Sequence, residues 1–330
     1  MGAASFDFDR EMQVFPPLRA GSVIAAGVSG GPDSMALLRL LSEWALRHDI
    51  AVHAYTVDHG LRAESAAEAA QVSAWVGGWP GVTHHILRWE GEKPETRILE
   101  EARAARYALM AASMKEAGAD SLFIAHHADD QAETVLIRLS RGSGLDGLAG
   151  MRKRHPMERL GITLLRPLLD IPKAELVRFC DENDIPYVSD PTNSNGDYLR
   201  PRLRAARPIL EEEGLSAKRL GMTARRMARA KAALDDMGQD LFTHALKEQK
   251  DDGFMFDYRA LHAAHEELAL RVILAVMERL HPGDGYGPRL ERLEKLLERI
   301  LRDGEFKGAT LGGCVFALDR RNESLWIGKE

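Results

Sequence analysis

The first residues whose types and spacing could do chemistry form the stretch GVSGGPDS, Gly27 to Ser34. The stretch follows an apolar run, so its glycines and hydroxyls stand where a strand would end and a helix would begin. Glycines at such a turn expose backbone N–H groups, and the helix that follows adds the positive end of its dipole. The natural ligand of such a loop is an anion, above all a phosphate, although a Gly-rich turn without a ligand is the plain alternative.

The loop differs from the two commonest phosphate loops. Its glycines, Gly27, Gly30 and Gly31, do not have the GxGxxG spacing of a dinucleotide fold, and the first lysine of the chain is Lys93, which excludes a Walker loop. A Walker lysine supports transfer of the terminal phosphoryl group, whereas hydroxyls and N–H donors suit a departing pyrophosphate. Asp33 would repel that anion unless Mg²⁺ lay between them. We therefore expect attack at the α-phosphate of ATP.

A second polar stretch, HHADDQAET, begins at His126. In a helix, His126, Asp130 and Glu133 would share one face, and Asp129 would lie four residues before Glu133. Carboxylates near the start of a helix often do no more than complement its dipole. The HExxH pattern of zinc hydrolases is absent, so a zinc site is not favoured.

The elements that must position these stretches are predicted by alternating patterns. Three short apolar runs, at 22–28, 51–57 and 121–125, alternate with helical patterns at 33–47, 66–76, 97–117 and 128–139. This order predicts an α/β fold with a doubly wound parallel sheet. The stretches SGGPDS, VDHGLR and HHADDQAET each follow one of the runs, so they should meet in one crevice at the carboxyl ends of the strands.

The second half of the chain has a different pattern. Pro172 suits the first turn of a helix that reaches Asn183, and a turn-rich stretch, SDPTNSNGDYLRPRLR, follows. Helical patterns from residue 216 to about 248 and beyond precede a Gly-rich, strand-like tail. We therefore expect a catalytic domain at 1–215 and, at 216–330, a linker helix with a smaller, mainly helical domain.

Composition limits the class of protein. The 330 residues are 45% hydrophobic, with no run of about 20 apolar residues and no visible secretory signal, so we expect a cytoplasmic protein and no membrane partner. The two cysteines, Cys180 and Cys314, form no CxxC pair, which argues against disulfide, zinc or iron–sulfur sites. The net charge is −6, yet residues 200–231 hold ten Lys or Arg against three acids. Lys218, Arg225 and Arg229 would share one helical face, suited to a phosphate backbone or simply to solvent.

The loop SGGPDS resembles that of the N-type ATP pyrophosphatases, which adenylate a carbonyl oxygen and then displace AMP. Members that thiolate tRNA need two catalytic cysteines or a CxxC cluster, and glutamine-fed members need an amidotransferase domain; neither is visible here. Six stretches in order, SGGPDS, VDHGLR, EEARAARY, HHADDQAET, RGSGLDGLAGM and SDPTNSNGDYLRPRLR, look like those of the tRNA(Ile)-lysidine synthases across most of the first 205 residues. The tail ATLGGCVFAL is similar to their small domain, in the short form of the family.

The resemblance implies a ligase. Such enzymes adenylate the carbonyl oxygen on carbon 2 of the wobble cytidine in an isoleucine tRNA with a CAU anticodon. The ε-amine of free L-lysine then displaces AMP, which gives lysidine. A synthetase acting on a small molecule and a nucleotide-sensing module without chemistry are the alternatives. Paired helices in the second half could also build a homodimer.

The resemblance also implies roles for individual residues. The expected ATP-binding set is Ser29, Gly30, Gly31, Pro32, Asp33, Ser34, Val57 and His59, with Asp33 also holding Mg²⁺. The expected catalytic set is Asp33, Arg106, Asp130 and Glu133, of which the last two would hold the substrate lysine or Mg²⁺ or take its proton. The expected substrate and tRNA set is Arg103, His126, Asp129, Arg200, Arg204, Arg225 and Arg229. Pro201 departs from the family, which usually has Asn there.

Overall fold

The protein is described by a computed structural model that covers residues 6–61, 64–91, 93, 96, 98–188, 199–282 and 289–330. The chain divides into two compact units. The first unit contains the residues up to Ile137 together with Gly150–Met222, and the second contains Arg138–Ala149 together with Thr223–Glu330. The main division falls inside one long helix, α9 (Ala217–Ala245).

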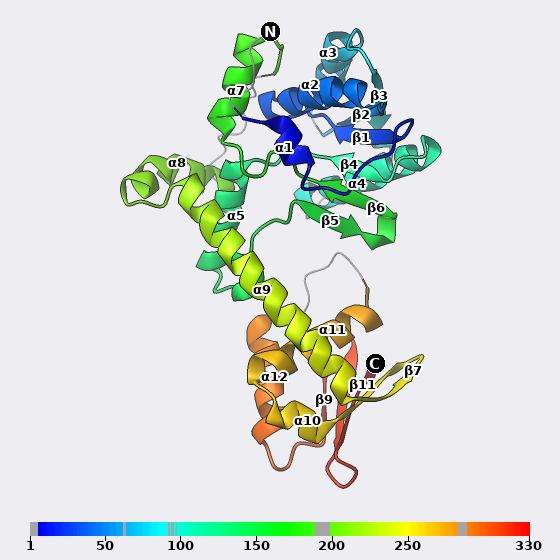
Figure 1. Ribbon diagram of the computed structural model, residues 1–330, viewed down its shortest axis with the longest axis vertical. Coiled ribbons are helices and arrows are strands. Elements are labelled where there is room, and N and C mark those ends of the chain that lie inside the picture. Colours follow the sequence, from blue (N-terminus) through cyan, green and yellow to red (C-terminus); the bar gives the residue numbers. More distant parts are fainter. Residues whose placement is uncertain are drawn as a thin grey trace. The chain divides into compact units, whose positions relative to one another are not determined.

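The first unit is built on a six-stranded sheet (Figure 1). Its strands are β1 (Val23–Gly27), β2 (Ala51–Asp58), β3 (Val82–Arg88), β4 (Ser121–Phe123), β5 (Arg154–Met157) and β6 (Ile162–Leu165). The order across the sheet is β3-β2-β1-β4-β6-β5, and every neighbouring pair is parallel except β5 and β6. This confirms the predicted fold class. The carboxyl ends of β1, β2, β4 and β6 therefore lie along one edge.

Helices surround this sheet. They are α1 (Phe8–Met12), α2 (Pro32–Arg47), α3 (Ser65–Val76), α4 (Ile98–Glu116), α5 (Ala128–Ser140), α7 (Lys173–Glu182) and α8 (Leu199–Glu212), with a 3-10 turn at Glu158–Leu160. Of these helices, α2, α3, α4, α5 and α7 match the sequence predictions closely, whereas α1 and α8 were not predicted. Pro32 lies at the start of α2 and Pro172 caps α7, positions where a missing N–H removes no helical bond. Among the described residues, no helix is both long enough and apolar enough to cross a bilayer.

The two faces of the sheet are covered by separate apolar layers, because side chains alternate along each strand. Ile24 and Ala26 of β1 join the layer formed with α1, α2, α3 and α7, which contains Phe123. Ala25 points the opposite way, into a layer with Tyr55 and the α4 helix. Burial on both faces fixes the register of the central strands and so holds the loops at their carboxyl ends in place.

The second unit combines helices with a sheet that the sequence patterns did not predict in full. Its elements are α6 (Leu145–Leu148), α9, β7 (Leu246–Lys250), β8 (Gly253–Asp257), α10 (Tyr258–Ala263), α11 (Glu266–Leu280), α12 (Leu290–Arg302), β9 (Gly308–Leu311), β10 (Cys314–Asp319) and β11 (Ser324–Lys329). The five strands form an antiparallel sheet in the order β7-β8-β11-β10-β9. The long helix ends at Ala245 and not near residue 248, because β7 pairs with β8.

Candidate active site

The phosphate loop joins β1 to α2 and is held by its own hydroxyl groups. The backbone N–H of Ser29 donates to Ser34 Oγ at 3.1 Å, and Ser34 Oγ donates to the carbonyl of Gly31 at 3.0 Å. Ser29 Oγ lies 3.2 Å from Ser34 Oγ. Gly31 is the N-cap residue of α2. It has no side chain that could accept bonds from the N–H groups of the first turn. The loop thus places N–H and hydroxyl groups at the start of a helix, where anions bind.

Gly30 is the one position in this loop where only glycine fits. Its φ is +83°, in the left-handed region, and an added Cβ would lie 2.7 Å from Cγ2 of Val72. Its carbonyl accepts a bond from the N–H of Val188 at 2.8 Å. The curl of the loop is therefore fixed by the backbone and by α3.

Asp33, in the first turn of α2, is the acidic group of the loop. Its Oδ1 atom is buried and has no hydrogen-bond partner among the described residues. Its Oδ2 atom lies 3.5 Å from His127 Nε2 and 3.5 Å from Lys173 Nζ. Burial alone would raise the pKa of this carboxyl, but His127 and Lys173 outweigh it and hold the pKa below its usual range. Asp33 is therefore an anion with one oxygen free for a cation.

His127 is a site residue that sequence reasoning missed, as are Lys173 and Arg207. Its side chain is only 5% exposed, and its Nε2 lies 3.5 Å from Asp33 and 3.4 Å from Asp130 Oδ2. Its backbone N–H donates to Asp130 Oδ2 at 3.2 Å.

The sequence offers two adjacent histidines, His126 and His127. Helical spacing from Asp130 and Glu133 pointed to His126, so His127 was not predicted. His127 brings the loop after β1 and the start of α5 together, so two of the three polar stretches meet as predicted.

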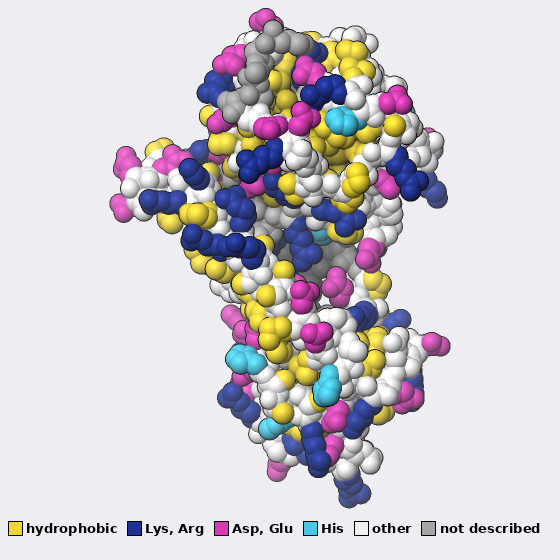
Figure 2. Space-filling view, in the orientation of Figure 1, with side chains coloured by type: hydrophobic (Ala, Val, Ile, Leu, Met, Phe, Trp, Pro, Cys, Tyr) yellow, Lys and Arg dark blue, Asp and Glu magenta, His cyan; other side chains and the backbone are white. Residues whose placement is uncertain are grey.

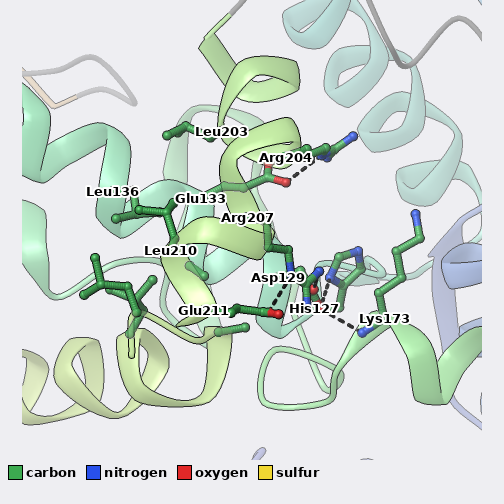
Figure 3. Close-up of a pocket in the computed structure, with 14 residues that line it drawn as sticks. His127, Asp129, Glu133, Leu136, Lys173, Leu203, Arg204, Arg207, Leu210 and Glu211 are labelled. Atoms are coloured by element: carbon green, nitrogen blue, oxygen red, sulfur yellow. Dashed lines mark hydrogen bonds and ion pairs between the residues drawn. The ribbon is translucent and has the colours of Figure 1, made fainter. Parts of the chain in front are cut away.

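The predicted acids of α5 are paired with two arginines of α8 (Figure 3). Arg204 Nε donates to Glu133 Oε1 at 2.6 Å and lies 3.8 Å from Asp130 through Nη2. Arg207 forms an ion pair with Asp129, which also accepts a bond from the backbone N–H of Lys173 at 2.8 Å. Asp129 therefore ties the start of α5 to the start of α7, while Glu133 and Asp130 share the cation Arg204.

A pocket of about 230 Å³ lies beside these pairs, between α5 and α8. Figure 3 shows its two kinds of wall, one polar and one apolar. The polar wall is formed by His127, Asp129, Glu133, Lys173, Arg204, Arg207 and Glu211. The apolar wall is formed by Ala132, Leu136, Leu203, Leu210, Leu215, Ala217 and Leu220. The pocket suits a small ligand that has both an apolar stem and charged groups.

His126 does not share a helical face with Asp130 and Glu133, because α5 begins only at Ala128. It instead accepts a bond from Arg166 Nε through its Nδ1 at 3.1 Å. Burial, together with the charges of Arg166, Arg103 and Arg200, lowers the pKa of His126 well below its usual value. Desolvation and the charge of Arg103 also lower the pKa of Arg106. The charges of these arginines thus disfavour protonation of His126 at this end of the sheet.

The loop after β2 is the third predicted stretch. Asp58 accepts a bond from the N–H of Gly60 at 3.0 Å and a short one from Ser65 Oγ, so it caps the turn into α3. The Ser65 bond is the main reason that the pKa of Asp58 is lowered. Val57 packs in the apolar layer on the α4 side, and His59 is part-buried in the turn. The turn lies beside the phosphate loop, since β1 and β2 are neighbours.

The predicted basic residues lie on two helices. Arg200 and Arg204 are on α8, where Pro201 falls in the first described turn, and a proline is tolerated there. Arg225 and Arg229 are exposed on α9, as are Lys218 and Arg219. Figure 2 shows Lys and Arg side chains gathered over α8 and the first turns of α9.

Asp33 is the carboxylate of the phosphate loop that could hold Mg²⁺. Mg²⁺ usually takes one or two carboxylates and completes its shell with substrate phosphates and water. The described part of the chain contains no cluster of three or more His, Cys, Asp or Glu side chains suited to a metal. The free Oδ1 of Asp33 beside a phosphate loop fits a shared ion of this kind.

Comparisons with known proteins show the family of the chain. Residues 6–210 match the family model of the PP-loop domain, an ATP-binding family, so the chain is a PP-loop protein. The tRNA(Ile)-lysidine synthase of Methylobacterium nodulans is 44% identical over 94% of this chain and 91% of its own length. That of a Bradyrhizobium species is 42% identical over 92% of this chain and 86% of its own. The chain belongs to the tRNA(Ile)-lysidine synthase family.

A solved structure supports the fold alone. The U34-tRNA thiolase of Methanococcus maripaludis has a TM-score of 0.56 and 19% identity, over 67% of this chain and 78% of its own. That protein carries a [4Fe-4S] cluster. Cys180 here is buried against α2, and burial raises the pKa of its thiol to about 12, so it is not a poised ligand or nucleophile.

Proposed function

We propose that this protein joins L-lysine to the wobble cytidine of an isoleucine tRNA with a CAU anticodon, using ATP. The observation that carries the proposal is the lysine-free phosphate loop with a free Asp33 oxygen, next to acids at the start of α5. The family named above supports the same reaction. The expected products are lysidine, AMP and pyrophosphate.

In the first step, the cytidine carbonyl oxygen on carbon 2 attacks the α-phosphorus of ATP and pyrophosphate leaves. The N–H groups and hydroxyls between Ser29 and Ser34 are suited to hold the departing pyrophosphate. Mg²⁺ would be held by Asp33 and would neutralise negative charge that develops on the phosphates. Arg103 and Arg106 on α4 are proposed to contact the α-phosphate or the cytidine, with Val57 and His59 bordering the adenosine.

In the second step, the lysine ε-amine attacks carbon 2 and AMP leaves. The pocket between α5 and α8 supports this because its apolar wall suits the methylene stem of lysine. Glu133 and Asp130 offer carboxylates for the ammonium group, and Arg204 or Arg207 offers a guanidinium for the lysine carboxylate. An ammonium ion is inert until it loses a proton, and one of these acids is proposed to accept that proton.

The exposed basic face of α9 is proposed to bind the tRNA backbone. RNA binding by cations releases counterions, so affinity falls as salt rises. We expect the triple variant Arg225→Ala, Arg226→Ala, Arg229→Ala to bind the tRNA more weakly and to lower the log–log salt slope by about 2 to 3. Filter binding at a series of salt concentrations measures both quantities.

A charge-matched control separates tRNA binding by α9 from a general effect of the protein's net charge. The triple variant Arg10→Ala, Lys115→Ala, Arg178→Ala removes three exposed cations from other elements and should leave the slope unchanged. If the α9 variant and the wild type have equal salt slopes, these arginines do not bind the tRNA backbone and are only exposed to solvent.

Labelled lysine tests the function directly. The protein is incubated with ATP, Mg²⁺, isotope-labelled L-lysine and a CAU-anticodon isoleucine tRNA transcript, and the nucleosides are analysed by mass spectrometry. The proposal predicts labelled lysidine only with the complete mixture, while a transcript with a GAU anticodon is the control. Pyrophosphate release driven by a free nucleotide would favour the small-molecule synthetase, and no release at all would favour the sensor.

Two further proposals concern the setting of the reaction. The tRNA substrate is consistent with a cytoplasmic enzyme. A homodimer built by the paired helices of the second unit stays a prediction, and light scattering on the purified chain tests it.

A further inference from the structure

Arg166 is a buried cation without an acidic partner in the described part of the chain. It directly follows β6, its exposed fraction is 5%, and its Nη1 donates to the carbonyl of Arg152 at 2.8 Å. Its Nε donates to His126 Nδ1 at 3.1 Å. A buried charge is costly unless it is paired, so an unpaired one held at the carboxyl edge of the sheet calls for a functional reason.

The bond between Arg166 and His126 fixes which imidazole nitrogen carries the proton. A guanidinium has only donors, so Nδ1 of His126 must accept and the proton must lie on Nε2. Among the described residues, the bond to Arg166 is the side-chain hydrogen bond of His126, and it leaves Nε2 without a partner there. His126 thus presents an N–H donor that no described residue accepts.

The surroundings of this donor favour an anion. Arg166 after β6 contacts His126, and the charges of Arg103 on α4, Arg200 on α8 and its neighbour His127 also act on this ring. The same edge of the sheet carries the phosphate loop, because β4 and β1 are parallel neighbours. A rigid N–H donor among guanidinium groups is suited to an oxygen that gains negative charge during a reaction.

We propose that Arg166 is a positioning residue that holds His126 as an Nε2–H donor to a phosphoryl oxygen. The proposal rests on the proposed function, which offers two sources of this phosphoryl oxygen: the α-phosphate of ATP and a backbone phosphate of the tRNA. Arg166 itself makes no contact with the reacting atoms in this account. It sets the tautomer and the orientation of His126, and it adds the charge that attracts the anion.

The test compares Arg166→Met with Arg152→Met, by ¹⁵N NMR of the imidazole nitrogens and by kinetics. Arg152 gives Arg166 only its backbone carbonyl, so the control keeps that contact. In the wild type and the control, the His126 signals, identified by their loss in His126→Asn, should show a neutral Nε2–H ring, and AMP should shift them on titration if the phosphoryl oxygen belongs to ATP. In Arg166→Met the ring should become a mixture of tautomers and its response to AMP should disappear.

Kinetics then separate the two sources of the phosphoryl oxygen. A fall in kcat of about 10²-fold in Arg166→Met, with unchanged tRNA affinity, would assign the α-phosphate of ATP. A weaker tRNA affinity with a salt slope lower by about 1 and unchanged kcat would assign the RNA backbone. Either outcome supports the proposal.

Stability distinguishes this role from a structural one. An arginine without an acidic partner gains little from burial, so Arg166→Met should melt at or above the wild-type temperature. A lower melting temperature of Arg166→Met with unchanged His126 NMR signals would overturn the proposal. Unchanged NMR signals together with unchanged kinetics would also overturn it. If Arg166→Met does not fold, Arg166→Lys replaces it, because lysine keeps the charge but not the fork that holds the ring. The NMR measurements use no lysine or tRNA, so they stand or fall separately from the proposed reaction.

Discussion

Asp33→Asn is expected to lower turnover by about 10³-fold or more while leaving tRNA affinity almost unchanged. Asn has the same shape but no charge, so the free oxygen at the phosphate loop would no longer hold a cation against the phosphates of ATP. His127 and Lys173, which lie 3.5 Å from the other oxygen, would be left without their anion. Formation of AMP measures turnover, and filter binding measures tRNA affinity.

The matched control for this variant is Asp9→Asn. Asp9 is an exposed acid on α1 that pairs with Arg47, so its loss removes the same charge far from the loop. It should leave turnover within about 2-fold of the wild type. A fully active Asp33→Asn protein would show that Asp33 does not hold a metal ion needed for turnover.

Arg271→Met is expected to destabilise the second unit by about 3 kcal/mol. Arg271, on α11, is 5% exposed and contacts Glu267 at 2.8 Å, Asp146 at 3.1 Å and Asp235 at 2.6 Å. These acids come from α11, α6 and α9. Removal of Arg271 leaves Glu267 without this cation, while Asp146 and Asp235 keep, among the described residues, only Lys231, at 2.7 and 2.6 Å. Native-state hydrogen exchange of the α11 amides measures the local free energy of unfolding.

Arg302→Met, on the neighbouring helix α12, is the control for Arg271→Met. Arg302 is 67% exposed and pairs with Glu266 at 3.2 Å, so its removal should cost less than about 1 kcal/mol. Equal losses for the two variants would mean that the buried network contributes no more than a surface pair.

The parts of the fold that were predictable from the sequence are those with strong local patterns. β1, the glycine loop and α2 follow from an apolar run, a Gly-Gly-Pro turn and helical spacing. By contrast, β3 was not predicted because it is an edge strand with polar side chains, and β5 and β6 have only four residues each. The first residues of β7 were assigned to the long helix, because their polar sequence does not alternate and only the pairing with β8 makes them a strand.

The candidate site shows the same limit at the level of single residues. Asp33 was predictable because its loop is contiguous, and its free oxygen fits the expectation. His127 and Arg166 carry no pattern of their own, since their roles depend on strands that meet only in three dimensions. The pairing of Arg204 with Glu133 joins residues separated by 71 positions, which no helical spacing can indicate.

The spent nucleotide is the most direct test of the account. The protein is incubated with ATP, Mg²⁺, L-lysine and the CAU-anticodon transcript, and the adenine nucleotides are separated by chromatography. Transfer of an adenylyl group predicts AMP and pyrophosphate in amounts equal to the lysine joined to tRNA. Accumulation of ADP would contradict it, because the terminal phosphoryl group would then be the one transferred.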